Sequence, residues 1–102
     1  VDGVSLESIR AAREAIGQVA RLTPLWPSTR LEEVCGQPVF LKCENMQRTG
    51  SFKIRGATNF VACMEPGASG AGLIAASAGN HAQGVAFAGR ARGLPVTVVM
   101  PV

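Results

Sequence analysis

The spacing of apolar residues along the chain changes repeatedly between the period of a helix and that of a strand. Where apolar residues recur every three or four positions we expect helices, and short alternating or continuous apolar runs indicate strands. The predicted elements, in order, are a helix over 5–21, an extended connector over 23–27, a short helix over 29–36, a strand over 38–44, a polar turn over 45–50, a helix over 51–64, a loop over 67–72, a strand over 72–77, a helix over 80–92 and a strand over 95–102. The last three form a βαβ unit, so the pattern predicts an α/β fold with a mostly parallel sheet.

Two helix starts carry side-chain cap signals. Ser5 stands where an N-cap of the first helix is expected. Residues 29–32 read Thr-Arg-Leu-Glu and match a capping box at the start of the short second helix.

Lys53 departs most from the apolar pattern. The helix over 51–64 has an apolar stripe from Ala57 to Met64 that includes Phe60, and Lys53 is expected to project from the same stripe. Burial and the positive end of a helix both disfavour an ammonium group, so Lys53 is a candidate nucleophilic amine suited to an aldehyde. The alternative is a lysine that reaches solvent from a frayed first turn, and the spacing alone leaves both open.

A second polar group, from Ser77 to Gly84, lies between the carboxyl end of a predicted strand and the start of a helix. Ligands bind at such positions in parallel sheets. Free backbone N–H groups and the Ser77 hydroxyl suit a carboxylate, and the Asn80 amide suits a phenolate oxygen. The alternative is that Ser77 or Asn80 only caps the helix. We expect His81, the single histidine, to support this loop and not to bind a metal.

Composition narrows the class of protein. The 102 residues allow one small domain at most, or a piece of a larger one, and 47% hydrophobic residues indicate a folded chain. The net charge of +3 is spread along the chain, so we expect no nucleic-acid partner. The three cysteines form no close pair, which is typical of a reduced, cytoplasmic protein, and no apolar run reaches the ~18 residues of a membrane span. Since the chain stops just after a strand with nothing to cover it, we expect a fragment.

Taken together, two stretches resemble the fold-type-II pyridoxal-phosphate enzymes. Leu41–Ala57 (LKCENMQRTGSFKIRGA) resembles the cofactor-lysine segment of threonine/serine dehydratases, and Ser77–Gly84 (SAGNHAQG) resembles the substrate loop of the same group. The resemblance covers nearly the whole chain from about Thr23. It implies the N-terminal fragment of a two-domain, three-layer parallel-sheet fold of the tryptophan synthase beta-like type. Residues 1–48 would then belong to the larger domain, and residues 49–102 would begin the smaller one.

The resemblance also implies roles for individual residues, with pyridoxal 5'-phosphate as the cofactor. Lys53 would hold the cofactor covalently and remove the Cα proton of the substrate. Phe52 would pack against the pyridine ring of the cofactor, and Asn80 would hydrogen-bond its 3-oxygen. The substrate carboxylate would be bound, largely by backbone N–H groups, by Ser77, Ala78, Gly79, Asn80 and His81.

Three positions separate the subfamilies. Ile54 and His81 resemble threonine dehydratases, whereas related synthases carry Asp and Thr there. Ala78 stands where serine racemases often carry Ser, which favours elimination over racemisation. The implied reaction is deamination of L-threonine or L-serine to 2-oxobutanoate or pyruvate and ammonia. The alternatives are a serine racemase of the same fold and a catalytically dead βαβ binding fragment.

The remaining site residues of the family are expected outside this stretch, and the stretch leaves several properties of the whole protein open. The glycine-rich loop that binds the cofactor's phosphate is expected downstream, so we predict that these 102 residues alone bind pyridoxal phosphate poorly and do not turn over threonine. We expect a homo-oligomer when the protein is full length. Preference between threonine and serine stays open, as does the choice between isoleucine biosynthesis and threonine catabolism.

Overall fold

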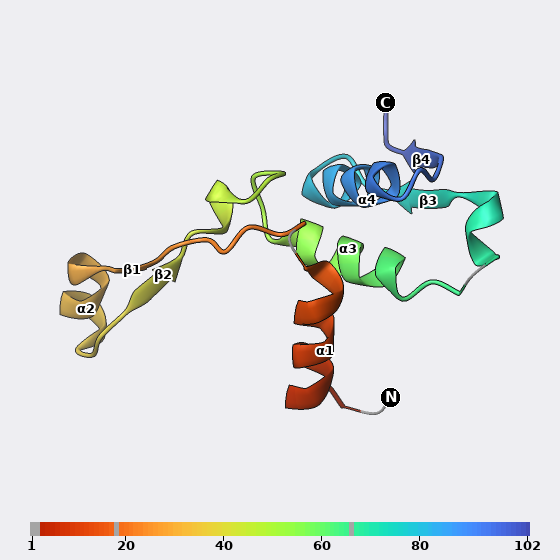
Figure 1. The fold of residues 1–102 in the computed structure, drawn as a ribbon. Helices are drawn as coiled ribbons and strands as arrows, with labels where there is room; N and C mark the ends of the chain where they lie inside the picture. The colour runs from red at the N-terminus through yellow and green to blue at the C-terminus, as the bar shows by residue number, and fades with distance from the viewer. Residues whose placement is uncertain (1–2, 18, 66) are drawn as a thin grey trace.

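The structure of the chain, a computed structural model, describes residues 3–17, 19–65 and 67–102 (Figure 1). Its elements are α1 (Leu6–Ile16), β1 (Leu25–Pro27), α2 (Thr29–Cys35), β2 (Phe40–Lys42), the 3₁₀ turn η1 (Glu44–Met46), α3 (Lys53–Ala62), the 3₁₀ turn η2 (Ala68–Ala71), β3 (Leu73–Ala76), α4 (Asn80–Ala91) and β4 (Val96–Val99). Apart from β1, the predicted order of helices and strands is confirmed, and so is the α/β class. Within the described ranges, no helix is both long and apolar enough to cross a membrane.

The carboxyl-terminal part is the predicted βαβ unit. β3 and β4 pair in parallel, from Leu73 opposite Val96 to Ala76 opposite Val99. The helix α4 connects them and lies against both strands (Figure 1). Leu73 and Ala75 are buried, whereas Ile74 is 79% exposed. The strand that we expected to be buried is thus covered on one face only.

Small residues let α4 approach its neighbours closely. A Cβ atom on Gly89 would collide with the side chain of Val96 and approach that of Leu73, so a glycine is needed where α4 packs on the sheet. The buried face of this helix consists of small residues, namely Ala82, Gly84, Ala88 and Gly89. The core formed by α3, β3 and α4 consists of Ala57, Val61, Leu73 and Ala88.

The segment from β1 to β2 extends away from α3 and α4 (Figure 1). The expected connector is in fact a strand, because residues 25–27 pair in antiparallel with β2, Trp26 opposite Leu41. The predicted strand over 38–44 is correspondingly shorter. Both strands are exposed along their whole length, with Trp26 58% and Phe40 56% accessible.

The end of α1 and the cap of α2 differ from the prediction, whereas the start of α1 agrees with it. Ser5 caps α1 as predicted, since its Oγ accepts from the N–H of Ser8 at 3.0 Å. The helix ends at Ile16 and not near residue 21, because Gly17 takes a φ of 45° that closes the helix. The capping box expected over 29–32 is wrong: the N-cap of α2 is Ser28, and its side chain makes no cap hydrogen bond.

Candidate active site

Lys53 is the first residue of α3, but it does not occupy a core position. Ile54 is completely buried, and the buried face continues through Ala57, Thr58 and Val61. The expectation that Lys53 projects from the apolar stripe is therefore wrong, because the next residue, Ile54, occupies the buried position. Phe60, which we also expected on that stripe, is 65% exposed. Lys53 itself is exposed.

The side chain of Lys53 lies at an open cavity of about 320 Å³. The cavity is lined by Phe52, Lys53, Arg55, Gly56, Ala57 and His81. Among the described residues, the amine has no hydrogen-bond acceptor or acidic partner, and it lies 5.1 Å from the centre of the Phe52 ring. Phe52 is itself 58% exposed, so its ring is not part of the core of the described residues. The arrangement presents an accessible primary amine beside an aromatic face.

The polar loop after β3 is built by Ser77. Its backbone N–H donates to the carbonyl of Val99 at 2.9 Å, which fixes the loop to β4. Its Oγ accepts from the N–H groups of Gly79 at 3.2 Å and Ala82 at 3.3 Å. The capping role, one of the two alternatives for Ser77, is thus present in the structure. The hydroxyl shapes the start of α4 by accepting these two bonds, and its own O–H can still donate.

Two backbone donors remain at the start of α4. In the described part of the chain, no acceptor lies within hydrogen-bond reach of the N–H groups of Asn80 and His81, and both residues are exposed. The helix that follows is 12 residues long, and its N-terminal end favours a negative charge. Chemically, this loop is suited to an anion such as a carboxylate.

At Gly84, α4 packs closely against the start of α3, which carries Lys53. A Cβ atom at Gly84 would lie 3.1 Å from the carbonyl carbon of Lys53, 3.2 Å from its oxygen and 3.3 Å from the nitrogen of Ile54. The backbones of α3 and α4 therefore touch at the residue that carries the amine. His81, one turn before Gly84, lines the same cavity as Phe52 and Lys53. The remaining predicted residues, Ser77, Ala78, Gly79 and Asn80, form the loop that leads to this cavity and do not line it.

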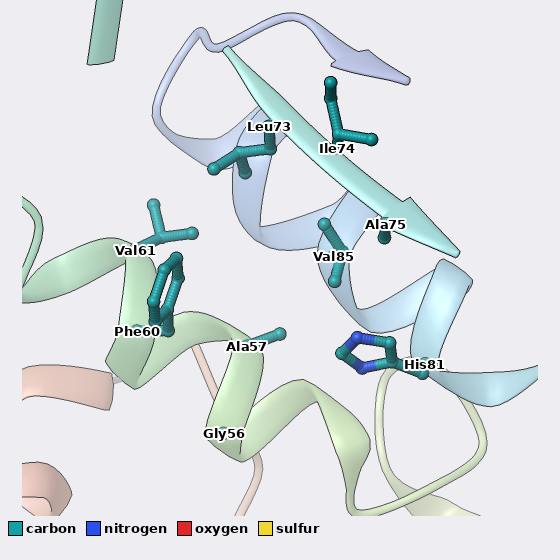
Figure 2. A pocket seen from close by; sticks show the side chains of 9 residues that line it. All are labelled: Gly56, Ala57, Phe60, Val61, Leu73, Ile74, Ala75, His81 and Val85. Atoms are coloured by element: carbon teal, nitrogen blue, oxygen red, sulfur yellow. The ribbon is translucent and has the colours of Figure 1, made fainter. Parts of the chain in front are cut away.

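A second cavity, also of about 320 Å³, adjoins the first (Figure 2). It lies between α3, β3 and α4, and Figure 2 shows the rings of Phe60 and His81 at its rim. Gly56, Ala57 and His81 belong to both cavities. This cavity was not predicted from the sequence. Phe60, an exposed aromatic residue on an amphipathic helix, is the residue that indicates it.

Glu44 and Arg55 form an ion pair that the sequence reasoning also missed. Arg55 Nη2 donates to Glu44 Oε1 at 2.7 Å and its Nε donates to Oε2 at 2.9 Å, so the pair is bidentate. Thr23 Oγ1 donates to Oε1 at 2.6 Å. The hydrogen bonds from Arg55, with a smaller contribution from Thr23, outweigh burial and lower the pKa of the Glu44 carboxyl from 4.5 to about 2.

The ion pair should make stability depend on pH in the acid range. Because the pKa of Glu44 is lower in the folded state, the stabilisation is complete above about pH 4.5 and is lost as the pH falls toward 2. We expect Glu44→Gln to lower the free energy of unfolding by about 2–3 kcal/mol at pH 7, with a difference from wild type that shrinks toward pH 3. Urea unfolding at both pH values measures this. A difference that is the same at both would contradict it.

The chain is similar to known proteins over most of its length. Residues 16–102 match the family described as pyridoxal-phosphate dependent enzyme. The chain is 49% identical to an L-threonine ammonia-lyase of Thermotoga maritima, over 96% of this chain and 24% of that protein. It is 45% identical to an L-threo-3-hydroxyaspartate ammonia-lyase of a Pseudomonas species, over 95% of this chain and 30% of that protein. The solved structure of maize serine racemase matches with a TM-score of 0.87 and 38% identity, over 96% of this chain and 31% of that one.

The fold and the site therefore define a class: this chain belongs to the family of pyridoxal-phosphate-dependent enzymes. The resemblance to fold-type-II enzymes of the threonine dehydratase group is confirmed. The chain spans less than a third of the length of these relatives.

The described residues fit part of the family's cofactor. Pyridoxal phosphate has an aldehyde, which an accessible amine such as that of Lys53 can bind, and an aromatic ring with an oxygen substituent, which an exposed amide such as that of Asn80 can contact. Its phosphate needs a cluster of donors of its own. The loop after β3 has free backbone donors next to the Lys53 cavity within the described ranges.

Proposed function

We propose that the protein to which this chain belongs deaminates a β-hydroxy amino acid, L-threonine or L-serine, to a 2-oxo acid and ammonia. The observation that carries the proposal is the juxtaposition of an accessible Lys53 amine with the donor-rich loop at the start of α4, held by the backbone contact at Gly84. An amine that binds an aldehyde and a loop that binds a carboxylate are the two groups that a cofactor-bound amino acid requires.

The residues of this chain would act as follows. Lys53 would hold the cofactor through its amine and would accept the Cα proton of the substrate on Nζ. The bound cofactor would supply the electron sink that makes this proton removable. Phe52 packs against the ring of the cofactor, and Asn80 donates to the oxygen of that ring.

The substrate carboxylate is bound at the start of α4. The backbone N–H groups of Asn80 and His81 point to the anion, and Ser77 keeps the loop in shape through its bonds to Gly79 and Ala82. We assign Ala78 and Gly79 to the same loop, where the absence of large side chains leaves room for the substrate. His81 then stands between the carboxylate and the Lys53 cavity.

The reaction is tested with the full-length protein and pyridoxal phosphate. L-Threonine and L-serine should release 2-oxobutanoate and pyruvate together with equal amounts of ammonia. L-threo-3-Hydroxyaspartate is the comparison substrate, because a relative acts on it. Racemised serine without ammonia would support the second candidate, a serine racemase, which the similarity to maize serine racemase favours. No conversion and no cofactor bound would support a catalytically dead binding fragment.

Ala78 is the position that we expect to separate elimination from racemisation. A hydroxyl at this place can donate a proton to the face of Cα opposite Lys53, so Ala78→Ser should raise the rate of D-serine formation from L-serine by at least about tenfold. Chiral chromatography of the recovered serine measures this. Ala86→Ser, on an exposed position of α4, is the matched control and should change nothing. Equal racemisation rates in the two variants would contradict the role given to Ala78.

A further inference from the structure

The start of α3 is held by few local bonds, although it carries the lysine of the proposed site. The N-cap residue is Phe52, whose side chain makes no cap hydrogen bond. The nearest substitute is a long bond of 3.4 Å from the N–H of Lys53 to Ser51 Oγ. A helix start without a good cap frays readily. The orientation of the Lys53 side chain therefore has to be fixed by other contacts.

Arg55 supplies such contacts two residues later, in the same first turn. Its guanidinium binds the Glu44 carboxylate with two hydrogen bonds and donates a third, of 3.1 Å, to the carbonyl of Arg21. A planar guanidinium with three acceptors allows little rotation. These bonds tie the first turn of α3 to Glu44 and Arg21, and Lys53 lies in that turn.

Glu44 and Arg21 are themselves fixed. Thr23 donates to the Glu44 carboxylate at 2.6 Å. The side chain of Gln47, which is 4% exposed, accepts from the N–H of Arg21 at 2.8 Å and donates to its carbonyl at 2.9 Å. We call this set, formed by Thr23, Glu44, Gln47 and Arg55 with the backbone of Arg21, the clamp. It joins three segments that are distant in the sequence.

On its other side, the same turn is bounded by α4, whose Gly84 contacts the Lys53 backbone. The first turn of α3 thus has two rigid neighbours, the clamp and α4. We propose that the Glu44–Arg55 pair is a positioning device, which sets the direction of the Lys53 amine toward the loop at the start of α4. This inference rests on the proposed role of Lys53. Arg55 also lines the Lys53 cavity, whereas Thr23, Glu44 and Gln47 do not. Glu44→Gln and Thr23→Val therefore change the clamp without removing a group from that cavity.

The test uses the full-length protein without cofactor. Pyridoxal phosphate is added, samples are reduced with borohydride at intervals, and the rate of adduct formation at Lys53 is read by peptide mass spectrometry. Glu44→Gln removes the charge of the pair, Arg55→Lys keeps the charge but loses the two-pronged geometry, and Thr23→Val removes one bond to Glu44. Glu33→Gln and Arg30→Lys, on the exposed α2, are matched controls without an ion-pair partner among the described residues.

We expect Glu44→Gln and Arg55→Lys to label Lys53 about tenfold more slowly or worse, at a temperature where circular dichroism shows them folded. Thr23→Val should fall between these variants and wild type, and the controls should match wild type. In turnover, kcat should fall while KM changes little. If Glu44→Gln does not fold, Arg55→Lys decides, and if neither folds, Thr23→Val decides.

Two outcomes would overturn the inference in distinguishable ways. Wild-type labelling rates in folded Glu44→Gln and Arg55→Lys would show that the pair only stabilises the fold, and the proposed role of Lys53 would stand. Absence of an adduct at Lys53 in the wild-type protein would remove that role, and the inference about the clamp would fall with it.

Discussion

Lys53→Ala should abolish turnover in the full-length protein. The variant loses both the group that holds the cofactor and the base that accepts the Cα proton, so we expect kcat/KM to fall by at least about 10³-fold. Stability should hardly change, because Lys53 is exposed and its amine, which lies over the neighbouring Phe52 ring, has no hydrogen-bond partner among the described residues. Release of 2-oxo acid from L-threonine, measured beside a melting curve, checks both expectations.

Lys42 provides the matched control, since the chain has two lysines. Its amine donates to the carbonyl of Thr23 at 2.8 Å, away from the Lys53 cavity. Lys42→Ala should keep most of the activity and lose a little stability. A Lys53→Ala variant as active as Lys42→Ala would contradict the proposed mechanism.

The second large effect is expected at Gly84. A methyl group here would press on the backbone of Lys53 and Ile54, with separations of 3.1–3.3 Å that rigid helical atoms accept poorly. We expect Gly84→Ala to lower the free energy of unfolding by about 1–2 kcal/mol, although alanine favours a helix by up to about 1 kcal/mol. The displaced first turn of α3 should also slow turnover.

Gly56→Ala is the same change in the neighbouring helix, where a Cβ atom has no heavy atom within 4 Å. It should raise stability by about 0.5–1 kcal/mol through helix propensity alone. Urea unfolding of the two variants in parallel isolates the packing term. If Gly84→Ala were as stable as Gly56→Ala, the close contact between α3 and α4 would not be a constraint on the site.

The fold was largely predictable because its periodicities are strong. The βαβ order from β3 to β4 was predicted from two short apolar runs on either side of one helix. The short strand β1 could not be recognised, since proline-rich residues 23–27 read as extended in any context and only pairing with β2 makes them a strand. The division of the chain into two domains near residue 48 stays a prediction.

Lys53 was selected for a reason that the structure corrects. We expected an amine made reactive by burial, but Ile54 takes the buried position and Lys53 is exposed. Phe60 is apolar but lies outside the buried face of α3, so the apolar stripe read from the sequence was displaced from that face. The choice of Lys53 rests on the resemblance of the whole segment and not on its helical face, and its role stays a prediction.

The contacts that assemble the site could not be predicted from one sequence. Glu44 and Arg55 are 11 residues apart and share no helix or strand, so no periodicity connects them. The contact between Gly84 and the Lys53 backbone likewise depends on how α3 and α4 cross. Free backbone donors were predicted throughout the loop over 77–81. The N–H groups of Ser77 and Gly79 are bonded within the protein, whereas those of Asn80 and His81 have no acceptor among the described residues. The binding of a substrate carboxylate to this loop stays a prediction.

The most direct measurement of the account is the location of the cofactor's covalent bond. The full-length protein is loaded with pyridoxal phosphate, reduced with borohydride and digested, and the modified peptides are sequenced by mass spectrometry. We predict one stoichiometric adduct, on Lys53, which is absent from Lys53→Ala and retained in Lys42→Ala. A stoichiometric adduct on any other lysine, with Lys53 unmodified, would contradict the account.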